Sequence, residues 1–375
     1  MNLGFLRPLY DGTGDCVSVY LDTDRTHENA LEAIELRWRA ARQRLAEAGA
    51  DPPSLDAAAA VMAGPGEARG YAVFARDGAV AFTGTLDAPP RREIARFAPL
   101  PHVMPLLAQR RPPIPHVRVS ATRGGGEIVA VGGSGREWRD WVAGQQWPLH
   151  KTSVGSRSQD RHQRSVEETW DENAKALATE VAAAATRAGA GHVIVSGDVR
   201  ARTLLLGHLP TLLRESATVL EEEVDADSPA MTEAADRALV KWADRRSRDR
   251  FDDWRARRAH GLAVEGLAAT MGALRDGQVS DLFLADDSSS TASAWIGPGG
   301  SDLASSSEEL LALDVPAPVA DRADAAIARA LAHTDAELHF LPADLVEAGD
   351  PAACGGIAHP RDGVCATLRF SLESR

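Results

Sequence analysis

Alternating and helical hydrophobic patterns divide the first third of the chain into strands and helices. Residues 16–22, CVSVYLD, alternate and are rich in β-formers, which predicts a strand. Apolar positions recur at helical spacing in residues 28–48, and an Ala-rich helix is expected over 54–63. Two strand-like runs surround Asp77-Gly78 in residues 70–86, a pattern typical of a hairpin. Residues 87–115 are dense in proline, so a domain boundary is expected there instead of regular structure.

The middle of the chain predicts a hairpin, a long helix and a strand. Residues 116–121 and 127–132 flank TRGGG, which is interpreted as a turn, because no helix follows at the spacing of a phosphate-binding loop. The sequence from Ser165 to Glu168 matches a capping box, and apolar residues after it repeat at helical spacing. The apolar run 192–199 predicts a buried parallel strand.

Helical and strand-like patterns alternate again toward the end of the chain. One long charged helix is predicted over 229–258. Residues 262–287 then contain an amphipathic helix, a glycine turn and a strand. Further strands are expected at 293–297, 337–341 and 364–370, with a helix at 319–333. The predicted fold class is therefore α/β (α+β).

Composition narrows the class of partner. The chain has 375 residues, of which 44% are hydrophobic and 25% charged, as in globular proteins of two or three domains. Its net charge of −13 argues against general nucleic-acid coating, since phosphate binding rests on Lys and Arg. DNA is therefore not an expected partner.

Cysteine usage and hydropathy indicate a reducing compartment. The cysteines Cys16, Cys354 and Cys365 show no CxxC spacing, so neither a disulfide framework nor a zinc site is expected. The first residues lack the apolar stretch of a signal peptide, and no run approaches the roughly 18 apolar residues of a membrane span. A cytoplasmic protein without a membrane partner, metal or other cofactor is predicted.

The chain lacks several common catalytic signatures. Walker A, G-x-S-x-G and H-E-x-x-H sequences are absent. His192, which begins a buried-looking strand, is interpreted as structural. The basic sequence 241–258 is interpreted as a solvated helix face with i,i+4 pairs, with contact to RNA as the alternative.

Residues 150–164 reverse the sign of the chain's charge. Their basic residues stand against a single acid, Asp160, and are Lys151, Arg157, Arg161 and Arg164. Two histidines and Gln163 add further hydrogen-bonding groups, and arginine and glutamine can contact RNA phosphates. From the residues alone, two interpretations have equal weight: a loop that binds phosphate, and a mobile surface loop without a function.

Four stretches of the chain resemble segments of a known superfamily. They are CVSVYLDTDR; PLHKTSV with Gln163 and VEETWDENAKALA; HVIVSGDVRARTLLLGHLP; and VEGLAATMGALRDGQVSDLFLADD. In this order they are similar to the archaeo-eukaryotic class I release-factor superfamily, which includes Pelota. The resemblance is closer to its bacterial branch, the group that contains the ribosome hibernation factor Balon and actinobacterial relatives.

The resemblance implies a three-domain, release-factor-like architecture. Residues 1–112 would form an N-terminal α/β domain. Residues 113–258 would form a middle domain with a mixed sheet, flanking helices, the 150–164 loop and a long helix. Residues 259–375 would form a C-terminal α/β domain, an α/β/α sandwich.

The resemblance also singles out a glutamine. In release factors the loop before the middle domain's long helix carries Gly-Gly-Gln, whose glutamine helps water attack the peptidyl-tRNA ester. Here the matching place holds His162-Gln163, and Gln159 is a competing match. Neither retains the two glycines, which allow positive φ and close approach to RNA. Gln163, with Gln159 as the alternative, is the candidate catalytic residue, and hydrolysis is placed in doubt.

The leading hypothesis is a ribosome-binding factor that occupies the A site in hibernation or rescue, under stress, without efficient ester hydrolysis. Its expected contacts with rRNA or peptidyl-tRNA are His150, Lys151, Arg157, Arg161, His162, Gln163 and Arg164. A translational GTPase is a further candidate partner of the third domain. The alternatives are a peptidyl-tRNA hydrolase, so that enzymatic activity stays open, and a non-ribosomal binding protein that keeps only the fold.

Overall fold

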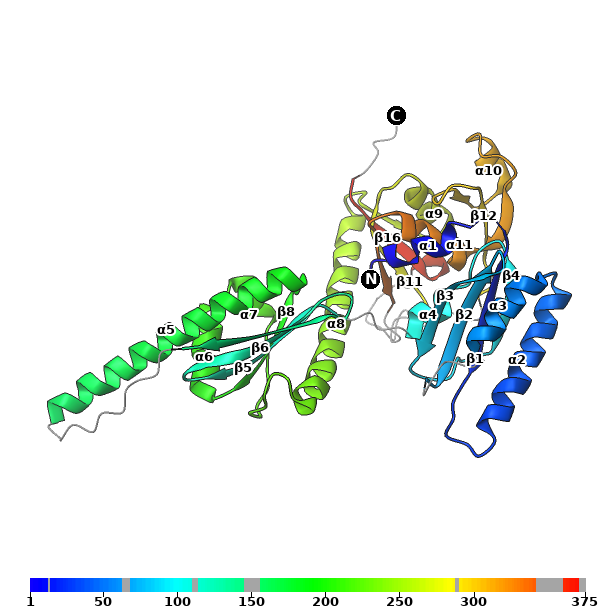
Figure 1. Cartoon of the computed structure of the whole chain (residues 1–375). Coiled ribbons are helices and arrows are strands. Elements are labelled where there is room, and N and C mark those ends of the chain that lie inside the picture. The colour runs from blue at the N-terminus through cyan, green and yellow to red at the C-terminus, as the bar shows by residue number, and fades with distance from the viewer. Residues whose placement is uncertain are drawn as a thin grey trace, which may run out of the picture. The chain divides into compact units, whose positions relative to one another are not determined.

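Two compact units make up the chain. The computed structural model describes residues 1–12, 14–62, 68–109, 114–144, 156–286, 290–341 and 360–370, with the backbone alone for 156–165. Met1–Arg111 and Arg246–Arg375 form one unit, and Pro112–Arg245 forms the other (Figure 1). Among the described residues, no helix combines the length and apolar character needed to span a bilayer.

The first third of the chain forms an antiparallel sheet of order β3-β2-β1-β4. Its elements are α1 (Arg7–Tyr10), β1 (Cys16–Asp22), α2 (Ala30–Glu47), α3 (Pro52–Met62), β2 (Gly70–Arg76), β3 (Ala79–Leu86), β4 (Ile94–Ala98) and α4 (Met104–Gln109), after a 3₁₀ turn at Gly4–Leu6. Alternation along β1 turns Val17 and Val19 toward α2 and α3, and Tyr20 toward the opposite face. Positive φ values at Asp77 and Gly78 close the predicted hairpin.

The middle unit is a mixed five-stranded sheet of order β7-β6-β5-β8-β9. Its elements are β5 (His116–Thr122), β6 (Gly125–Val131), β7 (Glu137–Ala143), α5 (Ser156–Ala188), β8 (His192–Gly197), α6 (Val199–His208), α7 (Thr211–Ser216), β9 (Thr218–Val219) and the first part of α8 (Pro229–Arg258). From Arg246 onward, α8 belongs to the other unit. β8 runs parallel to β5 and β9, as predicted, while β6 pairs antiparallel with β5 and β7.

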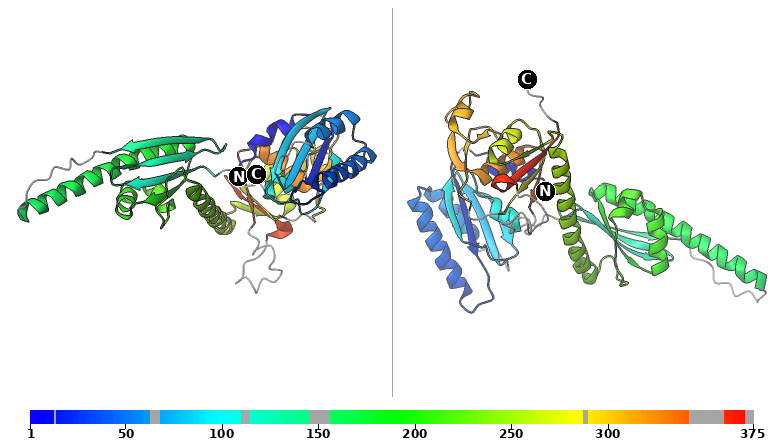
Figure 2. Two further views of the ribbon diagram at one scale, coloured as in Figure 1. Left: turned by 60° about the horizontal axis from the view of Figure 1, so that its bottom comes forward. Right: turned by 180° about the vertical axis from the view of Figure 1, so that it is seen from behind.

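Helices cover both faces of this middle sheet. Val117 and Val195 meet Leu177 and Val181 of α5 on one face, and Ile194 meets the first half of α8 on the other. Figures 1 and 2 show α5 lying along the sheet and continuing beyond its edge. The predicted mixed sheet with flanking helices is confirmed.

The last third forms a sheet of order β10-β16-β11-β15 and a smaller sheet of order β13-β12-β14. Its elements are β10 (Ala263–Glu265), α9 (Leu267–Arg275), β11 (Val279–Leu284), β12 (Ser293–Ile296), β13 (Leu303–Ala304), α10 (Ser307–Leu311), β14 (Val319–Arg322), α11 (Ala323–His333), β15 (Glu337–Phe340) and β16 (Val364–Leu368), with a 3₁₀ turn at Arg361–Gly363. Leu282 faces α9 and α11, whereas Phe283 faces Trp254 of α8. This layering agrees with the expected α/β/α sandwich.

Several elements differ from the sequence-based expectations. The proline-dense stretch 87–115 contains β4 and α4, so the prediction that it lacks regular structure is wrong. The strand β7 was not predicted at all, and β14 occupies the first part of the helix expected at 319–333. The division at residues 112 and 258 stays a prediction.

A glycine at the end of β8 provides a test of the middle sheet. Gly197 has φ 106°, and a Cβ there would lie 2.1 Å from the carbonyl oxygen of Ala121 on β5. We expect Gly197→Ala to lower the unfolding free energy of the middle unit by about 3 kcal/mol, since backbone must move. Gly189→Ala is the matched control, because it has φ 66° in open space and should cost about 1 kcal/mol.

Hydrogen exchange of the β5 and β8 amides, read by mass spectrometry, measures both effects locally. Equal protection of these strands in the two variants would contradict the close approach of β8 to β5.

Candidate nucleic-acid interface

The basic segment predicted as a loop is largely the beginning of a helix. α5 starts at Ser156, so Arg157, Gln159, Arg161 and Gln163 lie on helical backbone. His162 and Arg164 lie on it as well. The prediction of a loop over residues 150–164 is therefore wrong for 156–164, and Ser165 lies inside the helix instead of capping it. His150 and Lys151 lie outside the described residues.

Helix propensity explains the early start of α5. No glycine or proline occurs between Gly155 and Gly189, and arginine and glutamine are good helix formers. Asp160 stands three residues after Arg157 and four before Arg164, which are favourable spacings for opposite charges in a helix. Because extending a helix costs less than nucleating one, these residues continue the packed part of α5.

The helical backbone limits what the glutamines can do. In an α-helix each interior N–H and C=O is directed along the axis and used by i→i−4 hydrogen bonds. Gln163 lies inside α5, and Gln159 lies one turn before it. Neither occupies an exposed turn with positive φ, which is the conformation that glycines next to a catalytic glutamine permit.

On the next turns of α5, a tryptophan is packed against two arginines that come from other elements. The guanidinium of Arg123, from the β5–β6 turn, lies 4.8 Å from the ring centroid of Trp170, and that of Arg200, from α6, lies 5.2 Å from it. Asn173 of α5 donates a hydrogen bond to the Arg123 carbonyl at 3.0 Å. These contacts tie α5 to the β5–β6 turn and to α6 at the end of the sheet.

Carboxylates balance both arginines. Arg200 pairs with Glu167 at 2.7 Å, and Arg123 pairs with Asp198 at 3.1 Å. Asp198 also caps α6 by accepting from the N–H groups of Arg200 and Ala201. The bond from Ala201, together with Arg123, holds the pKa of Asp198 below its usual range, although its partial burial acts in the opposite direction. The arginines around Trp170 are therefore neutralised within the protein.

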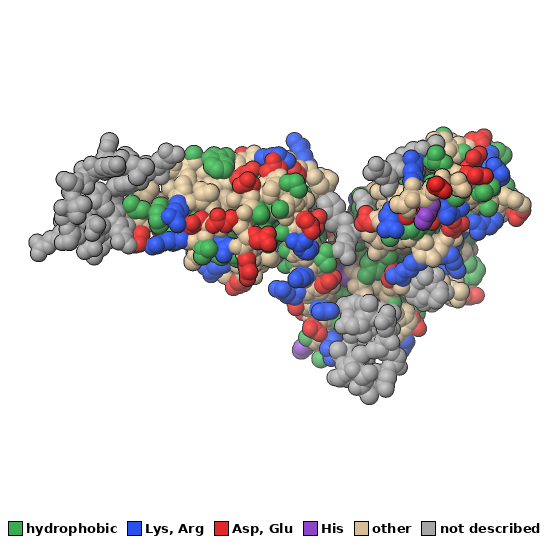
Figure 3. Space-filling view, turned by 90° about the horizontal axis from the view of Figure 1, so that it is seen from below, with side chains coloured by type: hydrophobic (Ala, Val, Ile, Leu, Met, Phe, Trp, Pro, Cys, Tyr) green, Lys and Arg blue, Asp and Glu red, His purple; other side chains and the backbone are tan. Residues whose placement is uncertain are grey.

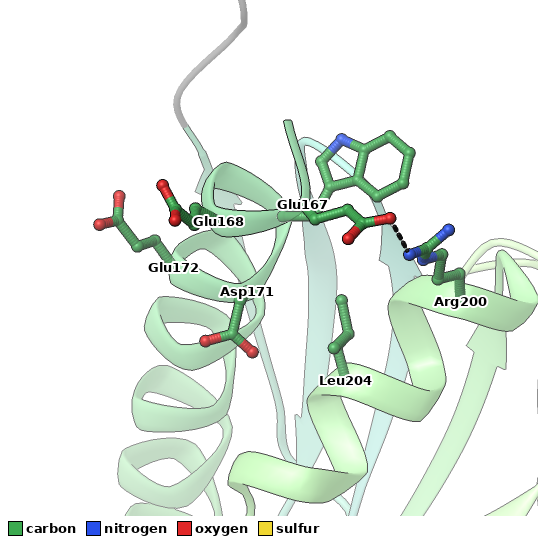
Figure 4. Close-up of a pocket in the computed structure, with 7 residues that line it drawn as sticks. Glu167, Glu168, Asp171, Glu172, Arg200 and Leu204 are labelled. Carbon is green, nitrogen blue, oxygen red and sulfur yellow. Dashed lines mark hydrogen bonds and ion pairs between the residues drawn. The ribbon is translucent and has the colours of Figure 1, made fainter. Parts of the chain in front are cut away.

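A hollow of about 520 Å³ opens beside Trp170, between α5 and α6 (Figure 4). Its lining residues are Glu167, Glu168, Trp170, Asp171, Glu172, Arg200 and Leu204. In Figure 4, Arg200 reaches toward Glu167, whereas Glu168 and Glu172 point away from it. Asp171 pairs with His208 of α6 at 2.8 Å. The acidic lining makes this hollow unsuited to phosphate.

The charge along α5 therefore changes sign within a few turns. Positions 157–164 are predominantly basic, and positions 167–172 carry four carboxylates. On the face seen in Figure 3, basic and acidic side chains are interspersed over the rest of the middle unit. Within α5, the net positive charge lies in positions 157–164, where it could attract RNA phosphates.

β7 carries an exposed tryptophan that is not among the site residues predicted from the sequence. Trp141 is 65% exposed on this edge strand, close in sequence to the start of the basic segment. Its neighbours Arg139 and Asp140 are held in ion pairs with Asp227 and Arg187. Exposed aromatic rings are the side chains on which unstacked RNA bases pack. The only sequence signal was the pair of tryptophans in REWRDW.

The basic end of α8 is internally paired. Arg255 pairs with Asp252 and Arg257 with Asp253 along the helix, while Arg258 pairs with Glu265. These pairs favour the interpretation of a solvated helix face over an RNA contact.

His192 has the structural role that the sequence suggested. It lies buried at the start of β8, its Nε2 is 3.1 Å from the Thr218 hydroxyl, and its ring packs on Trp242. Burial lowers the pKa of His192 to about 4, with nearby positive charge from Arg245 contributing. A histidine held neutral in this way contributes no charge to an interface near neutral pH.

The middle of the chain matches the model of a known protein family. Residues 115–260 match the family model described as bacterial archaeo-eukaryotic release factor family 2. Uncharacterized proteins of Mycobacterium tuberculosis, from strains CDC 1551 / Oshkosh and H37Rv, are each 28% identical over 387 residues, covering 99% of this chain and 97% of theirs. The predicted resemblance to the bacterial branch of the release-factor superfamily is thereby confirmed.

Similar chains also occur among solved structures. The archaeal termination factor aRF1 is 15% identical over 98% of this chain and 97% of its own, with a TM-score of 0.25. Archaeal Pelota, described as ribosome-bound with ABCE1, is 14% identical over 99% and 95%, with a TM-score of 0.37. Dom34 of S. cerevisiae is 11% identical over 81% of both chains, with a TM-score of 0.35.

The early start of α5 gives the next prediction. Ser165→Pro should break the helix, because an interior proline removes a hydrogen bond and clashes with the preceding turn, at a cost of about 3 kcal/mol. Circular dichroism should show lost helix, and hydrogen exchange should show faster exchange in residues 156–164. Ser165→Ala is the control and should leave both unchanged. A helix content unaffected by the proline would mean that α5 begins at Ser165.

Proposed function

We propose that this protein binds the ribosome as a translation factor of the release-factor type. The observation that carries the proposal is the basic start of α5, projecting from the sheet in the region that matches the release-factor family. In this proposal it occupies the A site, and α5 reaches toward the peptidyl-transferase centre. Its role is in hibernation or rescue.

Electrostatics supports an RNA contact limited to the end of α5. Binding to RNA phosphates draws mainly on arginine and lysine, and Arg157, Arg161 and Arg164 provide three such charges. The carboxylates at 167–172 would repel a phosphate backbone from the following turns. An otherwise acidic chain would thus bind RNA in one place and one orientation.

The conformation around the glutamines supports binding without efficient hydrolysis. Both Gln159 and Gln163 lie on helical backbone, and the two glycines of the release-factor loop are missing. Positioning water against the ester calls for a glutamine held at a turn that approaches RNA closely. We propose that the segment retains RNA affinity and has lost the reaction.

The other parts of the chain have proposed roles that follow from the resemblance. Residues 1–112 would face the decoding centre. Residues 259–375 would meet a translational GTPase. No contact residues are assigned to either partner.

Ribosome binding provides the direct test. Replacing Arg157, Arg161 and Arg164 by glutamine should weaken co-sedimentation with ribosomes at least tenfold and reduce the salt dependence by up to about three counterions, about one per lost phosphate contact. Glutamine retains helix propensity, so α5 should persist. The control replaces Arg187, Arg214 and Arg237, exposed arginines of the same unit, and should bind as the wild type does.

The two arms of this experiment separate the possible outcomes. If the wild type fails to sediment with ribosomes, including ribosomes from starved cells, ribosome binding itself is wrong, and a non-ribosomal binding protein remains. If both triple variants bind equally well, the protein binds ribosomes through a surface other than the start of α5.

Peptide release tests the chemistry. The wild type should release no more labelled peptide from stalled ribosome complexes than buffer does, and Gln163→Ala and Gln159→Ala should leave that background unchanged. A release agent that acts on the same complexes shows that they are competent. Release by the wild type that disappears in Gln163→Ala would establish a peptidyl-tRNA hydrolase instead.

A further inference from the structure

Three potential metal ligands converge on two neighbouring strands in the last third of the chain. Asp281 lies on β11, and Glu337 and His339 lie on β15. The parallel pairing sets Asp281 opposite Glu337 and Phe283 opposite His339. Residues two apart on a strand point to the same face, so the three side chains share one face of the sheet. One donor atom of each lies within 4.8 Å of the others.

The spacing of these donor atoms approaches that of a tetrahedral centre. The Nε2 atom of His339 lies 3.1 Å from Oδ1 of Asp281 and 3.6 Å from Oε2 of Glu337. Ligands around zinc at its usual bond lengths of about 2.0–2.2 Å are separated by about 3.3 Å in a tetrahedral arrangement. With the Glu337 carboxylate drawn closer, the three donor atoms would occupy three corners and leave the fourth to water.

The surroundings hold two of the ligands in place and leave the third accessible. The side chains of Asp281 and His339 are each 7% exposed, whereas that of Glu337 is 39% exposed. The Ser280 hydroxyl donates to Oδ2 of Asp281 at 2.9 Å, and the His339 ring stacks on Phe283. An ion could enter past Glu337 and meet a preorganised Asp–His pair.

The cluster already attracts positive charge. Arg250 lies 3.5 Å from Oδ1 of Asp281, and the amino group of Met1 lies 3.9 Å from Oε2 of Glu337. The Arg250 side chain is 41% exposed, so it can turn into solvent when a divalent ion takes its place. A bound ion would contact the two carboxylates directly, at shorter distances than either cation does.

We propose that Asp281, Glu337 and His339 form a binding site for a divalent transition metal of the zinc class. One imidazole and two carboxylates suit zinc and its neighbours, whereas magnesium and calcium prefer oxygen ligands alone. Three protein ligands with a fourth position open to water is the arrangement of accessible zinc centres. The site is independent of the proposed ribosome contact, which lies on α5.

Titration of the chelator-treated full chain tests the site. Cobalt(II), followed by its visible absorption, and zinc, followed by calorimetry, should each bind with one equivalent. Glu337→Gln, His339→Ala and Asp281→Asn should each weaken this binding at least tenfold. His260→Ala is the control, because His260 is exposed near the end of α8 and should not alter the titration.

Folding of each variant is checked by circular dichroism. The exposed position of Glu337 makes Glu337→Gln the deciding variant if either buried substitution prevents folding. Absence of one-equivalent binding by the folded wild type would overturn the proposal. Binding that is unchanged in folded Glu337→Gln would overturn it as well.

Discussion

The packing of α5 against the middle sheet is the interaction on which the candidate interface depends. The second half of the helix buries Leu177, Val181 and Ala184 against strands β5, β6 and β8. Its first turns continue beyond the sheet edge (Figure 2). An isolated helix of that length would be marginal in water, so the buried half stabilises the projecting half and sets its direction. The basic residues are thus placed by a core some distance along the same helix.

Local signals predicted much of the fold. The alternation in β1, the Asp77-Gly78 turn and the charged helix α8 agree with the structure because each is encoded by neighbouring residues. The prediction that the proline-dense stretch lacks regular structure failed for a physical reason. Its prolines flank β4, and Pro105 occupies the first turn of α4, where a missing N–H is tolerated. β7 is an edge strand whose charged sequence becomes a strand only through pairing with β6.

The candidate site was less predictable than the fold. Its basic composition is visible in the sequence, but its conformation is not, because a capping-box pattern also fits the interior of a helix that begins earlier. Trp170, Arg123 and Arg200 come from three elements that are joined only by folding. No short motif links them, so the neutralised arginines and the acidic hollow emerge only from the structure. The cluster of Asp281, Glu337 and His339 likewise depends on the register of two strands.

The helical start of α5 and the reversal of charge along it would both favour RNA binding over ester hydrolysis. A catalytic loop needs backbone freedom to bring a glutamine against an ester, and a helix removes that freedom. An RNA-binding tip needs fixed positive charge, and a helix provides it with little loss of entropy on binding, because the backbone is already ordered. The acidic turns that follow would confine the proposed RNA affinity to the tip. Such an arrangement would favour a protein that binds an RNA-lined site over one that hydrolyses an ester within it. The rigidity of the helix would aid RNA binding but oppose the positioning of a glutamine for hydrolysis.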